Sequence, residues 1–312
     1  MSSARASRPS LREAGRIGGY TVAMQGKTVV ITGATSGIGA VAARRLAELG
    51  ARIVIVARDE HRAQETLRDL RAAGTGGPHA AFYADLSRLS EMKRVAAEIA
   101  AAEPRIDVLM NNAGLIAARN LKTEDGIELM FATNHLSYFV LTNLLLERLR
   151  AAGDARVVST ASAAHRRGKL DFARLQEQKG PAGYGTTKLC NILFTRELAR
   201  RLAGSRVTAN CLHPGFVATR FGDDAGGVLR TGIAVAKRLF ALSPEEGAKT
   251  MVYLASSPDV AGRSGGYYER CAPAQPAREA QSDTDARRLW DLSAEITGIG
   301  ALGPMPRMAP PP

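Results

Sequence analysis

Two side chains that can exchange a proton, Tyr184 and Lys188, lie four residues apart in a predicted helix. This spacing places both side chains on one helix face, one above the other. A phenol titrates near about 10, too high for ready proton exchange at neutral pH, and a neighbouring ammonium favours the phenolate. The pair therefore predicts general acid–base chemistry, although the same spacing is also common in ordinary surface helices.

A glycine-rich turn is the second motif that could do chemistry. The string TGATSGIG at 32–39 follows a β-branched strand at 27–32 and precedes a helix at 39–49. Glycines let the chain turn tightly and bring N–H groups at a helix N-terminus against a pyrophosphate. The position between strand and helix predicts a dinucleotide-binding loop, and its expected contacts are Gly33, Thr35, Ser36, Gly37, Ile38 and Gly39.

The residue after the next strand indicates which dinucleotide is bound. An NAD site has a carboxylate at the end of the second strand, where it binds the 2′-hydroxyl of the adenosine ribose. Here the strand at 52–57 is followed by Arg58, and the first acid is Asp59. A guanidinium can hold a 2′-phosphate through two charge-assisted hydrogen bonds. The sequence therefore predicts NADP(H) in preference to NAD(H), unless Arg58 is only a surface residue at a helix start.

Strands alternate with helical patterns along the rest of the chain. This alternation predicts right-handed βαβ units and a parallel sheet that is covered on both faces. The expected fold class is α/β: a single-domain Rossmann fold, with a doubly wound parallel sheet of about seven strands and helices on both faces. Further strands are expected at 80–84, 108–111, 155–159, 207–212 and 265–269, with a strong helix start at Ser243-Pro244-Glu245-Glu246 and a terminal helix at 282–297.

The two ends of the chain differ from this pattern. Residues 1–25 are rich in Ser, Arg and Gly and predict a disordered extension, while 299–312 predict a Pro-rich tail. The folded domain is therefore expected at 26–298.

The composition argues against several function classes. Lys+Arg 42 against Asp+Glu 30 gives a net charge of +12, but the arginines are scattered rather than clustered with aromatics, so no nucleic acid partner is expected and a basic nucleic-acid-binding protein is a minor alternative. The three widely spaced cysteines form no metal-ligand pair, so we expect no metal and a cytoplasmic, reducing location. No apolar run is long enough to predict a membrane span.

Taken together, these motifs resemble the short-chain dehydrogenase/reductase family over about residues 26–298. The matching pieces are the glycine loop, Tyr184 with Lys188, Asp85-Leu86, Asn111-Asn112-Ala113-Gly114, Asn134, Ser162 and Pro214–Thr219. Longer strings such as NHLSYFVLTNLLL at 134–146 and CLHPG at 211–215 are similar to the retinol-dehydrogenase-like subgroup, which is itself similar to WW-domain oxidoreductase and protochlorophyllide reductase.

This resemblance implies four catalytic residues. Ser162 should hydrogen-bond the substrate oxygen, and Tyr184 should donate or accept the proton of that oxygen. Lys188 should hold the nicotinamide ribose and lower the pKa of Tyr184. Asn134 should use its backbone carbonyl to hold a water that links Lys188 to solvent.

The resemblance also implies further cofactor contacts. Asp85 and Leu86 should line the adenine pocket, and the segment from Asn111 to Gly114, with Asn112, Ala113 and Gly114 as contacts, should lie beside the adenosine ribose. The nicotinamide should be held by Pro214, Gly215, Val217 and Thr219. One departure from the family is Ala161, which stands where a pair of serines is usual and leaves Ser162 alone to supply the hydroxyl.

Several neighbouring residues are expected to be structural or to bind substrate. His135, His213 and Cys190 have no recognisable catalytic partners, so they are expected to be packed in the structure. The insert at 165–178 is expected over the mouth of the site. The segment 216–241 is expected to form a substrate lid whose apolar residues favour a hydrophobic substrate, although they fit a packed core equally well.

The expected function is an NADP(H)-dependent oxidoreductase that interconverts a hydrophobic aldehyde or ketone and its alcohol, with Tyr184 as general acid/base. The alternative is a non-catalytic, NADPH-binding regulatory protein of the same fold. A homodimer or homotetramer is expected, pairing through the apolar helix after Tyr184.

Overall fold

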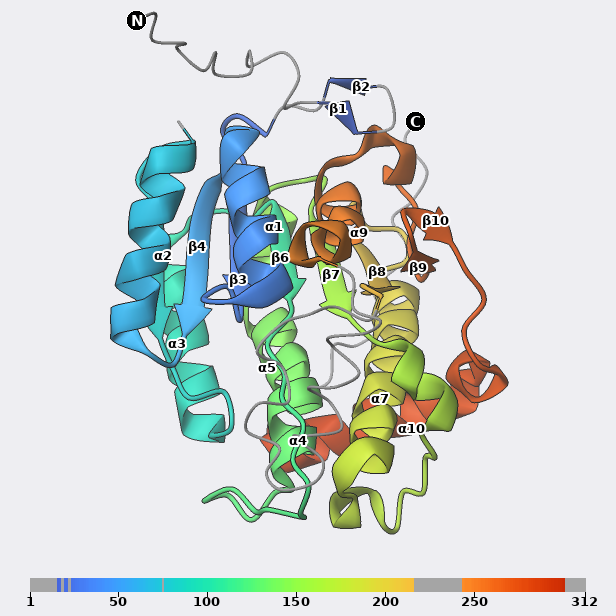
Figure 1. Cartoon of the computed structure of the whole chain (residues 1–312). Coiled ribbons are helices and arrows are strands. Elements are labelled where there is room, and N and C mark those ends of the chain that lie inside the picture. The colour runs from blue at the N-terminus through green and yellow to red at the C-terminus, as the bar shows by residue number, and fades with distance from the viewer. Residues whose placement is uncertain (1–15, 18–19, 22–23, 75, 216–242, 301–312) are drawn as a thin grey trace, which may run out of the picture.

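Eight strands form the main sheet in the computed structural model, which describes residues 16–17, 20–21, 24–74, 76–215 and 243–300. Neighbouring strands run parallel except for the last pair, β9 and β10, which is antiparallel (Figure 1). The order is β10-β9-β8-β7-β6-β3-β4-β5. The bounds are β3 Thr28–Thr32, β4 Arg52–Ala57, β5 Ala80–Tyr83, β6 Val108–Asn111, β7 Arg156–Thr160, β8 Thr208–His213, β9 Tyr267–Glu269 and β10 Ala272–Pro273.

Alternate side chains of the central strands enter two separate cores. Ile53 and Ile55 of β4 pack with one set of helices, and Val54 and Val56 pack with the other. Because both faces are buried, these strands are continuous apolar, β-branched runs. The expected doubly wound α/β fold is confirmed.

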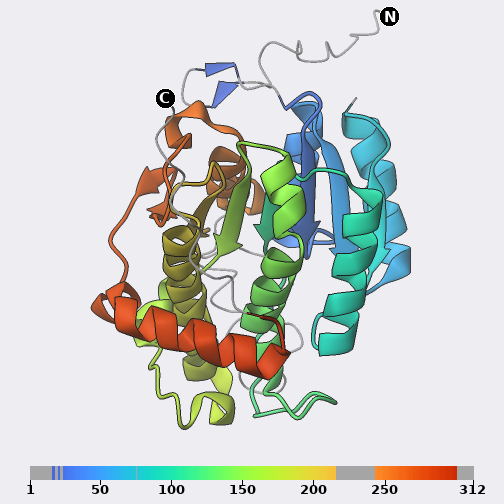
Figure 2. The ribbon, with the colours of Figure 1, turned by 180° about the vertical axis from the view of Figure 1, so that it is seen from behind.

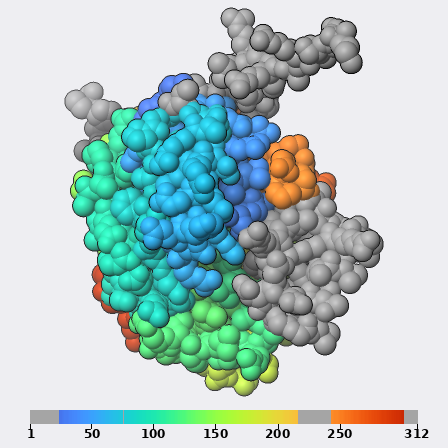
Figure 3. All heavy atoms as spheres, turned by 60° about the vertical axis from the view of Figure 1, so that its left-hand side comes forward, coloured from blue at the N-terminus to red at the C-terminus, as the bar shows by residue number. Residues whose placement is uncertain are grey.

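The helices divide between the two faces of the sheet (Figure 1). On one face lie α1 Gly37–Glu48, α2 Glu60–Ala73 and α9 Pro244–Ser256. On the other lie α3 Leu89–Ala102, α5 Ser137–Leu144 and α7 Gly180–Arg201, together with the short helices α4 Leu129–Phe131 and α6 Leu146–Ala151. Figure 3 shows α2, in cyan, on the outer surface near the β5 edge.

Helix starts follow the capping pattern of the sequence. The Ser243 Oγ accepts a hydrogen bond from the Glu246 N–H at 3.1 Å, with Pro244 in the first turn of α9. This confirms the helix start expected from Ser-Pro-Glu-Glu.

The terminal helix α10 (Asp283–Thr297) adds an outer layer over α5 and α7 (Figure 2). Trp290 of α10 is 1% exposed and stacks on Phe194 of α7 with ring centroids 5.7 Å apart, while its edge meets Phe139 of α5 at 4.9 Å. The apolar surface of α7 around Phe194 is therefore covered by α10 of the same chain. The expected homodimer or homotetramer stays a prediction.

Two features of the structure were not part of the sequence-based expectation. Within residues 1–25, β1 Arg16–Ile17 pairs antiparallel with β2 Tyr20–Thr21, and the Met24 side chain is buried. Strand β10 was not expected because its turn lacks glycine and asparagine, the residues that usually mark such hairpins. Arg270 and Cys271 instead adopt positive φ angles of 48° and 61°.

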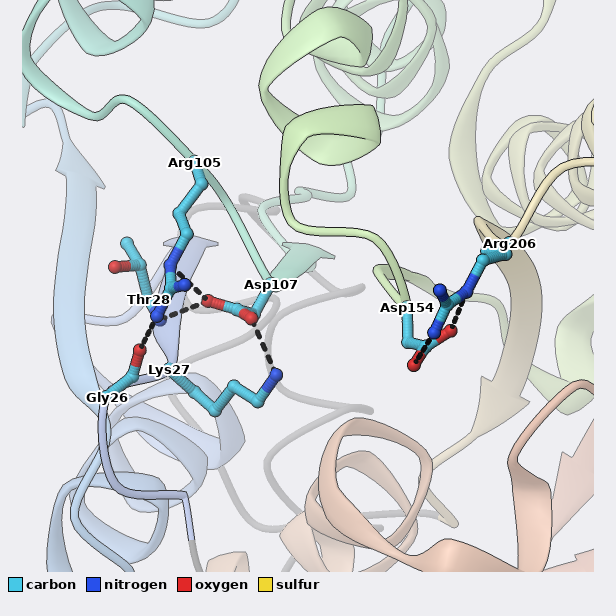
Figure 4. Close-up of polar contacts among 7 residues, drawn as sticks. All are labelled: Gly26, Lys27, Thr28, Arg105, Asp107, Asp154 and Arg206. Carbon is cyan, nitrogen blue, oxygen red and sulfur yellow. Dashed lines mark hydrogen bonds and ion pairs between the residues drawn. The ribbon is translucent and has the colours of Figure 1, made fainter.

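One buried carboxylate, Asp107, joins the amino ends of β3 and β6 (Figure 4). Its Oδ2 accepts a hydrogen bond from the Thr28 N–H at 2.9 Å, and its Oδ1 accepts one from the Lys27 Nζ at 2.8 Å. Figure 4 also shows an exposed counterpart, the pair of Asp154 with Arg206, whose side chains are 70% and 73% exposed. The nitrogen–oxygen distance is short in both pairs, so the two pairs differ in the burial of their carboxylates.

We expect Asp107→Ala to lower the free energy of unfolding by about 2–3 kcal/mol, because the buried Thr28 N–H loses a charged acceptor. The matched control Asp154→Ala should cost less than about 1 kcal/mol, since water screens and replaces an exposed pair. Urea unfolding of both variants measures the two values. Equal losses of unfolding free energy in the two variants would contradict the claim that burial makes the Asp107 contacts more stabilising.

Candidate active site

The predicted site residues gather where the carboxyl ends of β3, β6 and β7 meet. Strand β3 pairs with β4 on one side and with β6 on the other, so the strand order reverses between β3 and β6. In open α/β sheets, ligands bind beside such a switch point, outside the carboxyl ends of the strands. The glycine loop follows β3, the Asn112–Gly114 segment follows β6, and Ser162 follows β7.

The glycine loop closes against the segment after β6. Gly33 has a φ of +68°, and a Cβ on it would lie 2.9 Å from the Ala113 Cα. A Cβ on Gly39 would lie 2.3 Å from the Gly33 carbonyl oxygen, so neither position has room for a side chain. The Asn112 Nδ2 donates to the carbonyl oxygens of Thr32 and Gly33 at 3.0 and 3.1 Å, which fixes the turn.

The N-terminus of α1 has the features of an anion site. Ser36 precedes the helix in an extended conformation with φ −165°, its side chain makes no capping hydrogen bond, and the first turn holds no acid. Helices α3 and α7 likewise begin without a side-chain cap, whereas α2, α9 and α10 each have one. Thr35, Gly37 and Ile38 lie in the same turn, so the backbone N–H groups there suit a pyrophosphate.

Arg58 lies exposed directly after β4, and within the described part of the chain its guanidinium has no ion-pair or hydrogen-bond partner. The neighbouring acid, Asp59, is already engaged as the N-cap of α2. Its Oδ1 accepts a hydrogen bond from the Arg62 N–H at 3.0 Å, and this bond holds the pKa of Asp59 below its usual value. The Arg58 guanidinium is thus available to an anionic group of a ligand, while the Asp59 carboxylate is engaged as a helix cap.

The remaining predicted cofactor residues lie after other strands of the same sheet edge. After β5, the Asp85 Oδ1 accepts hydrogen bonds from the N–H and Oγ of Ser87, and the Leu86 side chain is buried. After β8, Pro214 is followed by Gly215, whose φ is +85°. Val217 and Thr219, with the expected lid at 216–241, lie outside the described residues.

The amino group of Lys188 is buried at the centre of the candidate site. Its side chain is 2% exposed, and its Nζ donates a hydrogen bond to the Thr160 carbonyl oxygen at 3.0 Å. The same Nζ lies 5.6 Å from the ring centroid of Tyr184 and 5.7 Å from that of Tyr138. Burial lowers the pKa of Lys188 to about 7, because the charged form loses hydration.

Two effects act in opposite directions on the pKa of Tyr184. Burial raises this pKa above its ordinary value, and a hydrogen bond with Ser162 lowers it by a smaller amount. Among the protein groups alone, burial therefore favours the protonated phenol. The lowering expected from Lys188 stays a prediction, because a bound oxidised nicotinamide would add its own positive charge beside the phenol.

Ser162 is placed beside Tyr184 by a turn that follows β7. Its Oγ accepts a hydrogen bond from the Ala164 N–H at 3.2 Å, and its side chain also forms a hydrogen bond with the Tyr184 side chain. Ala161, at the position of the missing serine, is buried. The Thr160 hydroxyl donates to the Asn112 Oδ1 at 3.3 Å, so it holds the segment after β6 rather than replacing that serine.

Asn134 lies in a π-helical turn, Ala132–Leu136, a rare conformation that is frequent at functional sites. Its Oδ1 accepts from the Leu115 N–H at 2.8 Å, and its Nδ2 donates to the Thr187 Oγ1 at 3.0 Å. The side chain thus joins the segment after β6 to α7. A Cβ on the adjacent Gly114 would lie 3.2 Å from the Asn134 Oδ1 and 3.5 Å from the Lys188 Nζ, so Gly114 borders both predicted catalytic residues.

A second residue at the Lys188 contact, Asn191, was not predicted from the sequence. The Asn191 Nδ2 donates to the Thr160 carbonyl oxygen at 3.2 Å, so this oxygen accepts from both Asn191 and Lys188. Thr187 and Asn191 follow Tyr184 by three and seven residues, and this helical spacing to one face could have indicated both.

Of the residues expected to be structural, His135 and Cys190 are buried, whereas His213 is half-buried and its Nδ1 has no hydrogen-bond partner among the described residues. The His135 Nε2 lies 2.9 Å from the Ser293 Oγ of α10, and burial lowers the pKa of His135 to about 4. Burial also raises the pKa of the Cys190 thiol, which is therefore a poor nucleophile. Across the described ranges, no group of His, Cys, Asp and Glu could hold a metal ion, and no helix has the length and apolar character to cross a membrane.

Comparison with known proteins places this geometry in a family. The sequence profile described as short chain dehydrogenase matches residues 27–226. Retinol dehydrogenase 14 of Homo sapiens is 41% identical over 307 residues, which cover 91% of this chain and 90% of that protein.

Two solved structures show the same likeness. A structure from Mycobacterium paratuberculosis has a TM-score of 0.70 and 33% identity, covering 89% of this chain and 95% of the other. The RhlG/NADP active-site complex of Pseudomonas aeruginosa has a TM-score of 0.64 and 27% identity, covering 78% and 94%.

The lowered pKa of His135 predicts an acid-sensitive fold. Because His135 stays neutral in the folded protein down to a pKa of about 4 but takes up a proton near 6.5 when unfolded, its contribution is complete above 6.5 and is lost as the pH falls toward 4. Between pH 7 and pH 5 this amounts to about 2 kcal/mol.

Thermal unfolding at both pH values, compared with His135→Gln, measures this contribution. The variant should show a smaller loss of stability on acidification than the wild type, since glutamine does not titrate. An unchanged pH dependence would show that His135 is not the responsible group.

Proposed function

The chain belongs to the short-chain dehydrogenase family, and we propose that it is an NADP(H)-dependent enzyme that interconverts a hydrophobic aldehyde or ketone and its alcohol. Family membership and its retinol dehydrogenase relatives make it an NAD(P)-dependent oxidoreductase acting on CH–OH donors. The observation that carries the finer proposal is the convergence of Ser162, Tyr184 and the buried Lys188 at one sheet edge.

In this proposal, each of the converging residues has one task. When bound, the reduced nicotinamide supplies the hydride that reduces the carbonyl carbon. The protonated Tyr184 phenol donates its proton to the carbonyl oxygen, and Ser162 donates a hydrogen bond to the same oxygen. Lys188, supported by the Thr160 carbonyl, holds the nicotinamide ribose, and the π-helical turn offers the Asn134 carbonyl to a water that links Lys188 to solvent.

The preference for NADP(H) is supported by charge at the end of β4. Arg58 is exposed and without a described partner, whereas the Asp59 carboxylate is occupied as a helix cap. The similarity to a structure described as an NADP complex agrees with this assignment. The pyrophosphate would be held by the glycine loop and the uncapped start of α1.

The proposed substrate is hydrophobic. On the described side of the site, Tyr184 and Leu115 pack against the apolar side chains of Ile116, Ala117 and Met130. Relatives named retinol dehydrogenase act, by their names, on a hydrophobic alcohol, which supports the same chemical class here.

The assembly and location of the enzyme are proposed on separate grounds. Free thiols at Cys190, Cys211 and Cys271 support a reducing, cytoplasmic location. A homodimer or homotetramer would have to pair through a surface other than the part of α7 that α10 covers.

Tyr184→Phe should lower kcat for carbonyl reduction by about 10²–10⁴-fold, because the phenyl ring has no proton to donate. The affinity for NADPH should stay the same, since the change removes only the hydroxyl. A screen of aldehydes, ketones and alcohols that follows nicotinamide absorbance measures turnover, and protein fluorescence measures NADPH binding.

The control for this experiment is Tyr253→Phe, on α9 away from the site, which should retain full activity. Wild-type protein that binds NADPH but turns over no compound in the screen would favour the non-catalytic regulatory alternative.

Arg58→Ala should weaken NADPH binding by about 10- to 100-fold, the value of one or two charge-assisted hydrogen bonds. NADH binding should change little, because NADH lacks the 2′-phosphate. Dissociation constants for both cofactors test this, with Arg68→Ala, an exposed position on α2, as the control. Equal wild-type affinities for NADPH and NADH would refute the cofactor preference.

A further inference from the structure

A buried histidine connects the proposed catalytic serine to the C-terminal part of the chain. His165 is 1% exposed and lies in the 3-10 helix Ala163–Arg167, directly after Ser162. Its Nδ1 lies 2.6 Å from the Ser162 carbonyl oxygen, and its Nε2 lies 3.0 Å from the backbone N of Ala277.

These two contacts fix the form of the imidazole ring. The Ala277 N–H can only donate, so the Nε2 must be the acceptor and carries no proton. A neutral imidazole then has its proton on Nδ1, which donates it to the Ser162 carbonyl oxygen. The ring is thus a neutral bridge with one donor end and one acceptor end.

Two further contacts hold the same turn, one with the same C-terminal segment and one with α7. Next to His165, the Arg166 Nη2 donates to the Gln275 carbonyl oxygen at 2.9 Å, so two consecutive residues bind the segment 275–277. On the other side, a Cβ on Gly168 would lie 2.6 Å from the Gly185 carbonyl oxygen, which shows close backbone contact with α7 one residue after Tyr184. The turn that carries Ser162 is therefore fixed between α7 and the C-terminal segment.

We propose that His165 is a positioning residue for the reaction: it sets the Ser162 turn relative to Tyr184 and couples that setting to the segment 275–277. The inference rests on the proposed function, because it takes Ser162 as the group that binds the substrate oxygen. Small displacements of such groups slow a reaction strongly, since misplacement by about 1 Å can reduce the rate by about 100-fold.

The bridge also gives the reaction a sensitivity to acid. A proton on the Nε2 would face the Ala277 N–H and break the hydrogen bond. Charged and titratable groups surround the ring: Arg166 on its own turn, Tyr267 and Glu269 on β9, His213 on β8 and Glu279 beyond β10. Burial lowers the pKa of His165. The hydrogen bond to the Ser162 carbonyl oxygen, and to a smaller extent Glu269 and Glu279, only partly offset that effect.

Two substitutions separate the ends of the bridge. His165→Gln keeps an acceptor near the Nε2 position but loses the donor to Ser162, and His165→Asn keeps a donor near Nδ1 but loses the acceptor for Ala277. The control is His79→Asn, another buried histidine, which accepts a hydrogen bond from the Ile53 N–H among the strands β4 and β5.

We expect His165→Gln to lower kcat by about tenfold or more with an unchanged dissociation constant for NADPH. The difference from wild type should shrink at pH values below the usual range of histidine, because His165 then takes up a proton and glutamine cannot. His165→Asn should lower kcat less, and should speed amide hydrogen exchange in residues 275–281. His79→Asn should lower thermal stability without changing kcat.

A His165→Gln protein that is folded and has a kcat within twofold of wild type would overturn the proposal. So would a variant that loses only thermal stability, as the His79 control does. If His165→Gln does not fold, the same test applies to His165→Asn, whose kcat must fall while exchange at 275–281 rises. Failure of the proposed function itself would look different, because the wild type would then turn over no carbonyl compound.

Discussion

The buried amino group of Lys188 is the constraint around which the site is built. An amino group without water needs polar partners, and here the Thr160 carbonyl oxygen and the rings of Tyr184 and Tyr138 surround it. The carbonyl belongs to β7, Tyr184 to α7 and Tyr138 to α5, so the contacts of one buried amino group bring three elements together. Asn191 shares the same carbonyl and fixes its direction.

Much of the fold and the cofactor loop could be predicted because their causes are local. Continuous apolar runs specify buried parallel strands, and the glycine at position 39 is required because the Gly33 carbonyl oxygen lies where a Cβ would be. The Ser243 cap likewise depends on neighbours in the sequence. The β9–β10 hairpin escaped prediction because Arg270 and Cys271 adopt positive φ angles that their residue types disfavour.

The parts of the site that could not be predicted depend on contacts between distant segments. Spacing indicates that Tyr184 and Lys188 share a face, but not that burial raises the pKa of one and lowers that of the other. In the same way, the π-helical turn at Asn134 and the shared acceptor at Thr160 exist only once β7, α5 and α7 have packed together. Local sequence patterns therefore predict which residues come together in the site. They do not predict which of these residues are protonated, because the pKa values depend on burial in the folded protein.

The placement of α10 has a consequence for biosynthesis. The contact between Ser293 and His135 spans 158 residues, and Trp290 closes the aromatic core of α5 and α7. A nascent chain still on the ribosome can form its first βαβ units, but it exposes Phe139 and Phe194 until the last helix has been translated. Premature termination before α10 would leave an exposed, aggregation-prone aromatic surface beside the active centre, and the cell's chaperones would have to shield it.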